Sequence, residues 1–255
     1  MKVVGVIPAR YASSRFPGKP LAPVAGRPMI QSVYERARLS ALLTDLSVAT
    51  DDVRIAKAVE SFGGRVFMTR SDHPSGSDRI AEVVERFYAD ADLVVNIQGD
   101  EPLMAPEAID LAINVMLSDA SAEVSTLVQP ITHVADLENP NVAKVVLSQD
   151  HTALYFSRSP IPFCRDCAAY ADWLEHHQYL KHLGLYVFRR ETLLRFVNWP
   201  PGHLERLEQL EQLRLLEHGI EVHVARTEYE GRSVDTPEDL EALNRELATG
   251  KNFRL

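Results

Sequence analysis

This sequence of 255 residues has few cysteines and no long apolar run. Cysteine occurs only at Cys164 and Cys167, which excludes a scaffold held together by several disulfides. No apolar run reaches the roughly 18 residues that a membrane-spanning helix needs. The apolar stretch near the start is too short for a secretory signal. We therefore expect a protein of the reducing cytoplasm with no membrane partner.

A positive net charge is also absent. The formal net charge is -9 at pH 7, whereas a nucleic-acid-binding face needs an excess of Lys and Arg, so nucleic acid is excluded as a partner. Neither the Walker A pattern nor G-x-G-x-x-G occurs. The composition, 45% hydrophobic and 25% charged, is that of an ordinary globular protein whose core needs no metal or disulfide to hold it.

The first segment of the chain lacks acidic residues altogether. No Asp or Glu precedes Glu35, yet a proline-rich loop there carries Arg10, Arg15 and Lys19 directly after the apolar run 3–7. Such a loop can wrap a polyphosphate with its cations and backbone N–H groups. The alternative is an ordinary solvated basic loop. The length of the acid-free interval favours the binding site.

Strand and helix patterns alternate through the first half. Apolar runs at 3–7, 46–50, 65–68 and 93–97 predict buried strands. Helical spacing follows each of them, at about 29–39, around 55–59, around 80–84 and at 106–117, with Asp51 or Asp52 a candidate cap for the second. This alternation predicts an α/β fold with a mostly parallel central sheet flanked by helices. The second half is less regular and predicts a mixed-sheet extension, with leucines at helical spacing over 204–216.

Three polar segments should gather beyond the carboxyl ends of the strands, where open parallel sheets bind ligands. In "QGDEP", Asp100 is suited equally to holding Mg²⁺ and to capping the next helix. In "VDTPEDL", Asp235 or Thr236 reads more simply as a helix cap. Ser75 to Ser77 open a helix and can approach a nucleoside, although an ordinary loop would look the same.

The cysteine pair C-R-D-C is interpreted as two free thiols. Zinc would need about four ligands, and the histidines downstream are irregularly spaced. A redox C-x-x-C is expected to open a helix near an early βαβ unit, which this pair does not.

Together these segments closely resemble the 3-deoxy-manno-octulosonate (Kdo) cytidylyltransferases, or CMP-Kdo synthetases, over essentially the whole chain. The resemblance rests on eight ordered segments: "IPARYASSRFPGKPL" (7–21), "MTRSDHPSGSDR" (68–79), "NIQGDEP" (96–102), "NPNVAKVVL" (139–147), "ALYFSRSPIP" (153–162), "KHLGLYVFRR" (181–190), "LEQLEQLR" (207–214) and "VDTPEDL" (234–240). The segment 164–169 is not one that the family shares.

The resemblance implies a reaction, a cofactor and an assembly. CTP and Kdo would give CMP-Kdo and pyrophosphate, with Mg²⁺, in a nucleotidyltransferase-type fold that works as a homodimer in the cytoplasm and supplies lipopolysaccharide synthesis. It implies one cytidylyltransferase domain over 1–255. The nucleotide and metal core would cover 1–120 and 220–255, and the sugar-binding and dimerisation part roughly 125–218.

The resemblance also assigns residues. It makes Arg10, Lys19, Asp100 and Asp235 catalytic, with Asp100 and Asp235 as the metal ligands. The nucleotide would contact Arg10, Arg15, Lys19, Ser75, Gly76, Ser77 and Arg79. The sugar acid would contact Arg15, Gln98, Arg158, His182, Tyr186, Glu211 and Gln212.

Four alternatives stay open. The same reaction could use the 8-amino analogue of Kdo, although "QGDEP" and "VDTPEDL" follow the common form. Sialic-acid cytidylyltransferases open with a shorter Gly/Ser-rich loop. A catalytically silent nucleotide-binding module would not need Arg10, Lys19, Asp100 and Asp235 together. A glycosyltransferase would usually carry Asp-x-Asp, which Gly99-Asp100-Glu101 is not.

Overall fold

The computed structural model describes residues 1–12 and 15–249, and the chain divides into two compact units. The first unit contains Met1–Asp110, Phe188–Val197 and the chain from Gly231 onward, and the second contains Leu111–Val187 and Asn198–Glu230. Ser13 and Ser14 of the basic loop lie outside the described residues. The expectation of a single cytidylyltransferase domain over the whole chain stays a prediction.

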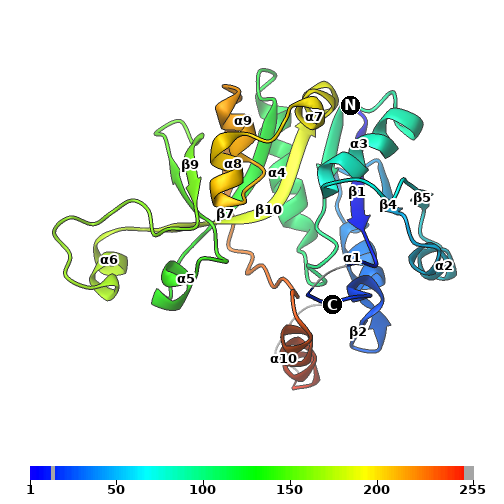
Figure 1. Ribbon diagram of the computed structural model, residues 1–255, viewed down its shortest axis with the longest axis horizontal. Coiled ribbons are helices and arrows are strands. Elements are labelled where there is room, and N and C mark those ends of the chain that lie inside the picture. The colour runs from blue at the N-terminus through cyan, green and yellow to red at the C-terminus, as the bar shows by residue number, and fades with distance from the viewer. Residues whose placement is uncertain (13–14, 250–255) are drawn as a thin grey trace. The chain divides into compact units, whose positions relative to one another are not determined.

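The first unit is built around parallel strands (Figure 1). They are β1 (Val3–Ala9), β4 (Asp45–Thr50), β5 (Val66–Met68) and β6 (Leu93–Asn96). Strand β1 pairs with β4 on one side and with β6 on the other, and β4 pairs with β5. The apolar side chains of β1 are almost fully buried, as expected for a strand covered on both faces. The predicted α/β class with a mostly parallel sheet is confirmed.

Helices of the first unit follow the strands, and three of them start at polar side-chain caps. They are α1 (Met29–Ala37), α2 (Val53–Ser61), α3 (Gly76–Phe87), α7 (Arg190–Asn198) and α10 (Pro237–Ala248), while α4 (Pro106–Ser118) runs from the first unit into the second. The side chains of Asp52, Ser75 and Thr236 accept hydrogen bonds from the first-turn N–H groups of α2, α3 and α10. The expected cap at Asp51 or Asp52 is therefore Asp52.

The basic loop itself contains little regular structure. A single 3₁₀ turn covers Lys19–Leu21, and the short strands β2 (Pro23–Val24) and β3 (Arg27–Pro28) form a two-stranded hairpin. The basic loop is therefore characterised by its cationic side chains and not by a long helix or strand.

The second unit is a mixed arrangement of strands, as predicted. Its strands are β7 (Val124–Pro130), β8 (Lys144–Leu147), β9 (Ala153–Ser157), β10 (Leu180–Arg189) and β11 (Val222–Arg226). Strand β11 is parallel to β7, whereas β8 is antiparallel to both β9 and β10. Its short helices are α5 (Val134–Glu138), α6 (Tyr170–His176), α8 (His203–Glu208) and α9 (Leu213–Glu217). Use of this extension in dimerisation stays a prediction.

The single helix suggested by the leucines of 204–216 is wrong. Helix α8 ends at Glu208, Gln209 adopts the left-handed conformation with φ 53°, and α9 begins only at Leu213. Arg158 accounts for this break. Its guanidinium donates hydrogen bonds to the carbonyls of Glu208 and Gln209, which a continuous helix would use for its own backbone hydrogen bonds.

The described part of the chain contains no helix long and apolar enough to cross a membrane.

Candidate active site

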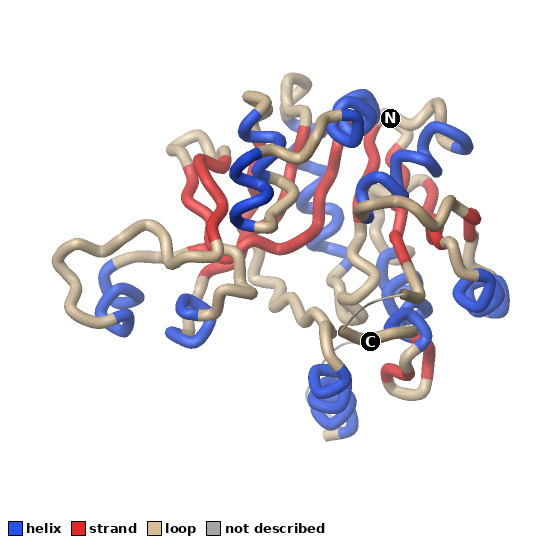
Figure 2. Tube along the Cα trace, viewed as in Figure 1, coloured by secondary structure: helices blue, strands red, loops and turns tan. Residues whose placement is uncertain are grey.

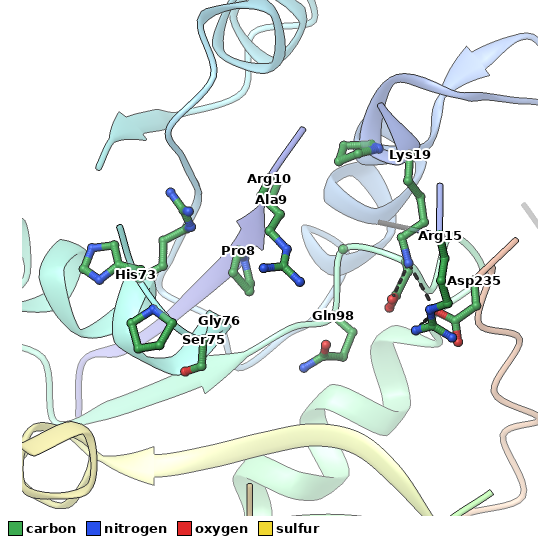
Figure 3. A pocket seen from close by; sticks show the side chains of 15 residues that line it. Pro8, Ala9, Arg10, Arg15, Lys19, His73, Ser75, Gly76, Gln98 and Asp235 are labelled. Atoms are coloured by element: carbon green, nitrogen blue, oxygen red, sulfur yellow. Dashed lines mark hydrogen bonds and ion pairs between the residues drawn. The ribbon is translucent and has the colours of Figure 1, made fainter. Parts of the chain in front are cut away.

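The largest set of predicted site residues meets in one pocket of the first unit, about 250 Å³ in volume (Figure 3). The pocket lies at the carboxyl ends of β1 and β6, where parallel neighbours end at the same edge. Its lining includes Arg10, Arg15, Lys19, Ser75, Gly76, Arg79, Gln98, Asp100 and Asp235. In Figure 3, Arg15, Lys19 and Asp235 gather at one end, His73 and Ser75 at the other, and Arg10 and Gln98 between them.

Lys19 joins two carboxylates that are far apart in the sequence. Its Nζ lies 2.8 Å from Asp100 Oδ2 and 3.4 Å from Asp235 Oδ1. Arg15 Nη2 lies 3.2 Å from the same oxygen of Asp235. One end of the pocket is therefore a compact cluster of two anions and two cations, defined here as the charge cluster: Arg15, Lys19, Asp100 and Asp235.

Asp100 is positioned by a close approach of two backbone segments. A Cβ on Gly99 would lie 3.0 Å from the Pro8 carbonyl oxygen, so only glycine lets the turn after β6 pass so near β1. The Val234 N–H then donates to the Asp100 carbonyl at 2.9 Å and ties this turn to the start of α10. Asp100 does not cap the next helix, because α4 begins only at Pro106.

Asp235 is held by the helix cap beside it. Thr236, not Asp235, caps α10, and the Asp239 carboxylate accepts from the N–H groups of both Asp235 and Thr236. Val234 is 1% exposed and packs with Met29, Leu103 and Leu240 in an apolar cluster. With its neighbours anchored in this way, the Asp235 side chain is available to the charge cluster.

Lys19 follows a turn that is anchored at both ends. Gly18 has φ 74°, and its N–H donates to the Tyr11 carbonyl at 2.9 Å. The Arg54 guanidinium stacks 3.3 Å from the centre of the Tyr11 ring. Lys19 itself begins the 3₁₀ turn, Pro20 follows it, and the Lys19 side chain lines the pocket.

The other end of the pocket is formed where α3 begins. Ser75 caps α3, and Gly76 lies against Pro8. Ser77 is 2% exposed and is not among the lining residues. Arg79 lines the pocket, yet its guanidinium also contacts Thr69, the Arg70 carbonyl and Asp51. These contacts anchor the loop before α3.

Sequence reasoning missed His73 in this region. Its Nε2 lies 2.6 Å from Glu82 Oε2, and its ring lines the pocket. Although burial raises the pKa of Glu82, hydrogen bonds from His73, the Arg70 N–H and Arg86 outweigh it and lower that pKa to about 2. The ionised Glu82 fixes the orientation of His73. The signal available was "HPSGSDR" itself, with a histidine two residues before a helix cap.

The second unit contains the remaining predicted sugar-site residues. His182 Nε2 lies 2.9 Å from Thr126 Oγ1, and the rings of His182 and Tyr186 are 5.2 Å apart between centroids. Desolvation lowers the pKa of His182 to about 3. Desolvation, together with the Glu211 carboxylate, raises the pKa of Tyr186 well above its ordinary value. Gln212 is 5% exposed. We call His182, Tyr186, Glu211 and Gln212 the neutralised cluster, because burial holds its imidazole and phenol uncharged.

Arg158 has a different environment from the other sugar-site candidates. Its guanidinium donates to three backbone carbonyls, those of Glu208 at 2.6 Å, Pro140 at 2.8 Å and Gln209 at 3.0 Å. Desolvation lowers the pKa of the nearby Lys144, and the positive charge of Arg158 lowers it further. Lys144 is fully buried and was not singled out from the sequence. Arg158 therefore positions the turn that leads to Glu211 and Gln212.

The interpretation of Cys164 and Cys167 as free thiols is wrong. The structure joins them in a disulfide. A turn with the Cys167 N–H directed at the Cys164 carbonyl brings their Cα atoms to 5.4 Å, within bridging range. The pair packs against an apolar cluster of Leu137, Trp173 and Tyr179, in the long loop between β9 and α6 (Figure 2).

The charge cluster fits a magnesium ion. Its two carboxylates converge on one cation, and carboxylate oxygens are ligands that Mg²⁺ prefers. Over residues 1–12 and 15–249, no group of three or more His, Cys, Asp or Glu side chains could hold a metal. Mg²⁺ usually keeps several waters and binds through one or two carboxylates plus substrate phosphates, so two carboxylates suffice.

Comparison with known proteins defines the class. The family model described as "Cytidylyltransferase" matches residues 4–223. A cytidylyltransferase structure from Leptospira borgpetersenii has the same fold, with a TM-score of 0.65 at 18% identity and with 100% of this chain and 90% of that one covered. The fold of this chain is thus that of a cytidylyltransferase.

Closer relatives define the family. A 3-deoxy-manno-octulosonate cytidylyltransferase of Syntrophobacter fumaroxidans is 52% identical over 95% of this chain and 96% of its own, and one of Geobacter metallireducens is 48% identical over 97% and 98%. A solved CMP:2-keto-3-deoxy-manno-octonic acid synthetase complexed with CTP has a TM-score of 0.90 at 44% identity, covering 98% and 99% of the two chains. The chain belongs to the 3-deoxy-manno-octulosonate cytidylyltransferase family.

Proposed function

We propose that this protein transfers CMP from CTP to the anomeric hydroxyl of Kdo, with Mg²⁺, and releases pyrophosphate. The charge cluster carries the proposal, because it offers cations to a triphosphate and two carboxylates to a metal within one pocket. The relatives that bear this activity in their names, and the neighbour complexed with CTP, support it.

The residues of the pocket have distinct proposed tasks. Arg10, Arg15 and Lys19 bind and orient the triphosphate, whose negative charge they offset. The acid-free interval serves this task, since a carboxylate there would repel phosphate or compete for the cations. Ser75 and Gly76 contact the nucleoside where α3 begins, Ser77 is buried behind them, and Arg79 anchors the loop before the helix.

Asp100 and Asp235 would hold the metal. When bound, Mg²⁺ supplies charge neutralisation at the phosphate oxygens and lowers the pKa of an oxygen it coordinates. The chain's own part is to orient these carboxylates, through Gly99 and through the cap of α10.

We propose sugar-acid contacts within each unit taken by itself: Gln98 and Arg15 in the pocket of the first unit, and the neutralised cluster in the second unit. His182 and Tyr186 offer an uncharged imidazole and an un-ionised phenol as hydrogen-bonding groups, beside the Glu211 carboxylate. Arg158 contributes by positioning the turn before Glu211.

We also propose a homodimer that acts in the cytoplasm. Leu154, Phe163 and Leu207 of the second unit are 61%, 75% and 69% exposed, which supports a protein contact there. Light scattering of the purified protein should give twice the chain mass of 28.6 kDa; a monomer at working concentration would refute the dimer.

A sugar panel tests the reaction. Purified protein is incubated with CTP, Mg²⁺ and one of Kdo, its 8-amino analogue or N-acetylneuraminate, and released pyrophosphate is measured. We expect the highest kcat/KM with Kdo and little release when UTP replaces CTP or when EDTA is present. No release with any sugar from folded protein would overturn the proposal, and a preference for the 8-amino analogue would change the substrate.

A further inference from the structure

Lys19 occupies the position between the two carboxylates proposed to hold metal. Its ammonium nitrogen lies within 3.4 Å of an oxygen of Asp100 and of Asp235. The Lys19 side chain is only 15% exposed, and those of Asp100 and Asp235 are 27% and 38% exposed. A partly buried ammonium therefore already pairs with both carboxylates.

The same ammonium disfavours a metal ion. A magnesium ion binds carboxylate oxygens at about 2.0–2.1 Å, so an ion on these oxygens would lie only a few ångströms from Lys19 Nζ. Like charges at such a separation repel strongly in a partly buried site. Arg15, at 3.2 Å from Asp235, adds to the repulsion. The protein also offers no third carboxylate, histidine or cysteine there among the residues that the structure describes.

A triphosphate changes this balance. It provides Lys19 with several anionic oxygens, and it provides the missing metal ligands at the same time. Lys19 lies at the end of a turn anchored through Tyr11 and Gly18, so its flexible stem can redirect the ammonium without displacing the backbone.

We propose that Lys19 acts as an internal counter-ion that couples metal binding to nucleotide binding. In the free protein it pairs with both Asp100 and Asp235, and on nucleotide binding it moves to the triphosphate and leaves both carboxylates to the metal. This inference rests on the proposed function, because the metal and the triphosphate are those of the proposed reaction. By linkage, the metal and the nucleotide then strengthen each other's binding by the same factor.

Binding of Mn²⁺ without nucleotide gives the test. Mn²⁺ stands in for Mg²⁺, and electron paramagnetic resonance measures the free ion, so no turnover is needed. Lys19→Met should bind Mn²⁺ on the order of tenfold more tightly than the unaltered protein, because a like charge has been removed. Lys19→Arg should resemble the unaltered protein. Arg27→Met is the matched control, since Arg27 pairs with the distant Glu35, and it should change nothing.

A second pair of variants shows where the ion binds. The gain of Lys19→Met should disappear when Asp100→Asn or Asp235→Asn is added. With a non-hydrolysable CTP analogue, corrected for Mn²⁺ on the analogue alone, metal affinity should rise more in the unaltered protein than in Lys19→Met. Thermal melts of every variant establish that it is folded.

Two outcomes would overturn the coupling. One is Mn²⁺ affinity in folded Lys19→Met that is no higher than in the unaltered protein, and the other is a gain that survives the addition of Asp100→Asn or of Asp235→Asn. The proposed function fails separately: pyrophosphate release without the Mn²⁺ effect refutes only the coupling. The Mn²⁺ effect without release from any sugar refutes only the reaction.

Discussion

The charge cluster of the first unit and the neutralised cluster of the second unit differ in the charge state of their titratable side chains. In the charge cluster, Arg15, Lys19 and the two aspartates remain ionic and balance one another in a pocket that solvent reaches. In the neutralised cluster, desolvation lowers the pKa of His182 and raises that of Tyr186, so both side chains are uncharged at neutral pH.

Under the proposed function, the two clusters suit two different kinds of ligand. Paired charges near solvent can exchange partners at little cost, which suits a highly charged nucleotide and a metal. Buried neutral groups hold a fixed hydrogen-bond pattern, which suits recognition of sugar hydroxyls. Variants in the first cluster should therefore affect nucleotide chemistry, and variants in the second should affect sugar use and stability.

The largest effect is expected from the two carboxylates. Asp100→Ala and Asp235→Ala should each lower kcat about a hundred- to thousandfold, because the developing charge loses its positioned counter-charge. Pyrophosphate release at limiting Mg²⁺ measures this, and Asp90→Ala, whose exposed carboxylate pairs with Lys2, is the control. Near-normal turnover in a folded variant would remove that residue from the metal site.

A smaller and more selective effect is expected at Glu211. Glu211→Gln should raise the KM for Kdo about ten- to hundredfold, the loss expected for one hydrogen bond to a charged group. The KM for CTP should stay unchanged. Glu175→Gln, an exposed position on α6 of the same unit, controls for charge. A rise confined to the KM for CTP would contradict the division of tasks between the clusters.

Removal of the disulfide should alter stability and leave chemistry intact. The double variant Cys164→Ser, Cys167→Ser opens a very short loop, so chain entropy sets its cost at about 2 kcal/mol or less. Urea unfolding measures this cost against the unaltered protein, and kcat with CTP and Kdo should match. A large fall in kcat would show that the loop between β9 and α6 takes part in the reaction.

The smallest effect is a pH dependence of stability from His182. Its folded-state pKa of about 3 lies below the ordinary 6.5, so only the unfolded state takes up a proton between these values. The contribution of His182 to the free energy of unfolding is fully present above pH 6.5 and decreases as the pH falls below 6.5. Since only the unfolded state takes up this proton, we expect the free energy of unfolding to fall by about 1 kcal/mol between pH 7.5 and 5.5.

His182→Gln isolates this contribution. Urea unfolding at both pH values should show a weaker pH dependence for His182→Gln than for the unaltered protein. Equal pH dependence in the two proteins would mean that His182 titrates normally in the folded state.

The alternating first half was predictable from local patterns. The strands and helices from β1 to α4 fall close to the ranges that apolar runs and helical spacing indicated, and Asp52, Ser75 and Thr236 cap helices as their residue types favour. These features depend on neighbours within about a turn of chain, so a sequence pattern is sufficient to predict them.

Predictions from the sequence are wrong or missing where residues distant in the sequence determine the local structure. The leucines of 204–216 have helical spacing, yet Arg158, from another segment, takes the Glu208 and Gln209 carbonyls and the helix breaks. Cys164 and Cys167 gave no signal of pairing, because their pairing depends on a turn. His73 was overlooked because its partner Glu82 lies one element further along.

Local sequence patterns establish the alternation of strands and helices in the first half, the acid-free basic loop and the side chains able to meet a nucleotide and a metal. The contact of Lys19 with both Asp100 and Asp235, and the neutral imidazole of His182, depend on the three-dimensional fold. The physical reason is that side-chain chemistry and local backbone preference belong to each residue, whereas Coulomb energy and desolvation depend on which distant residues the fold places beside it.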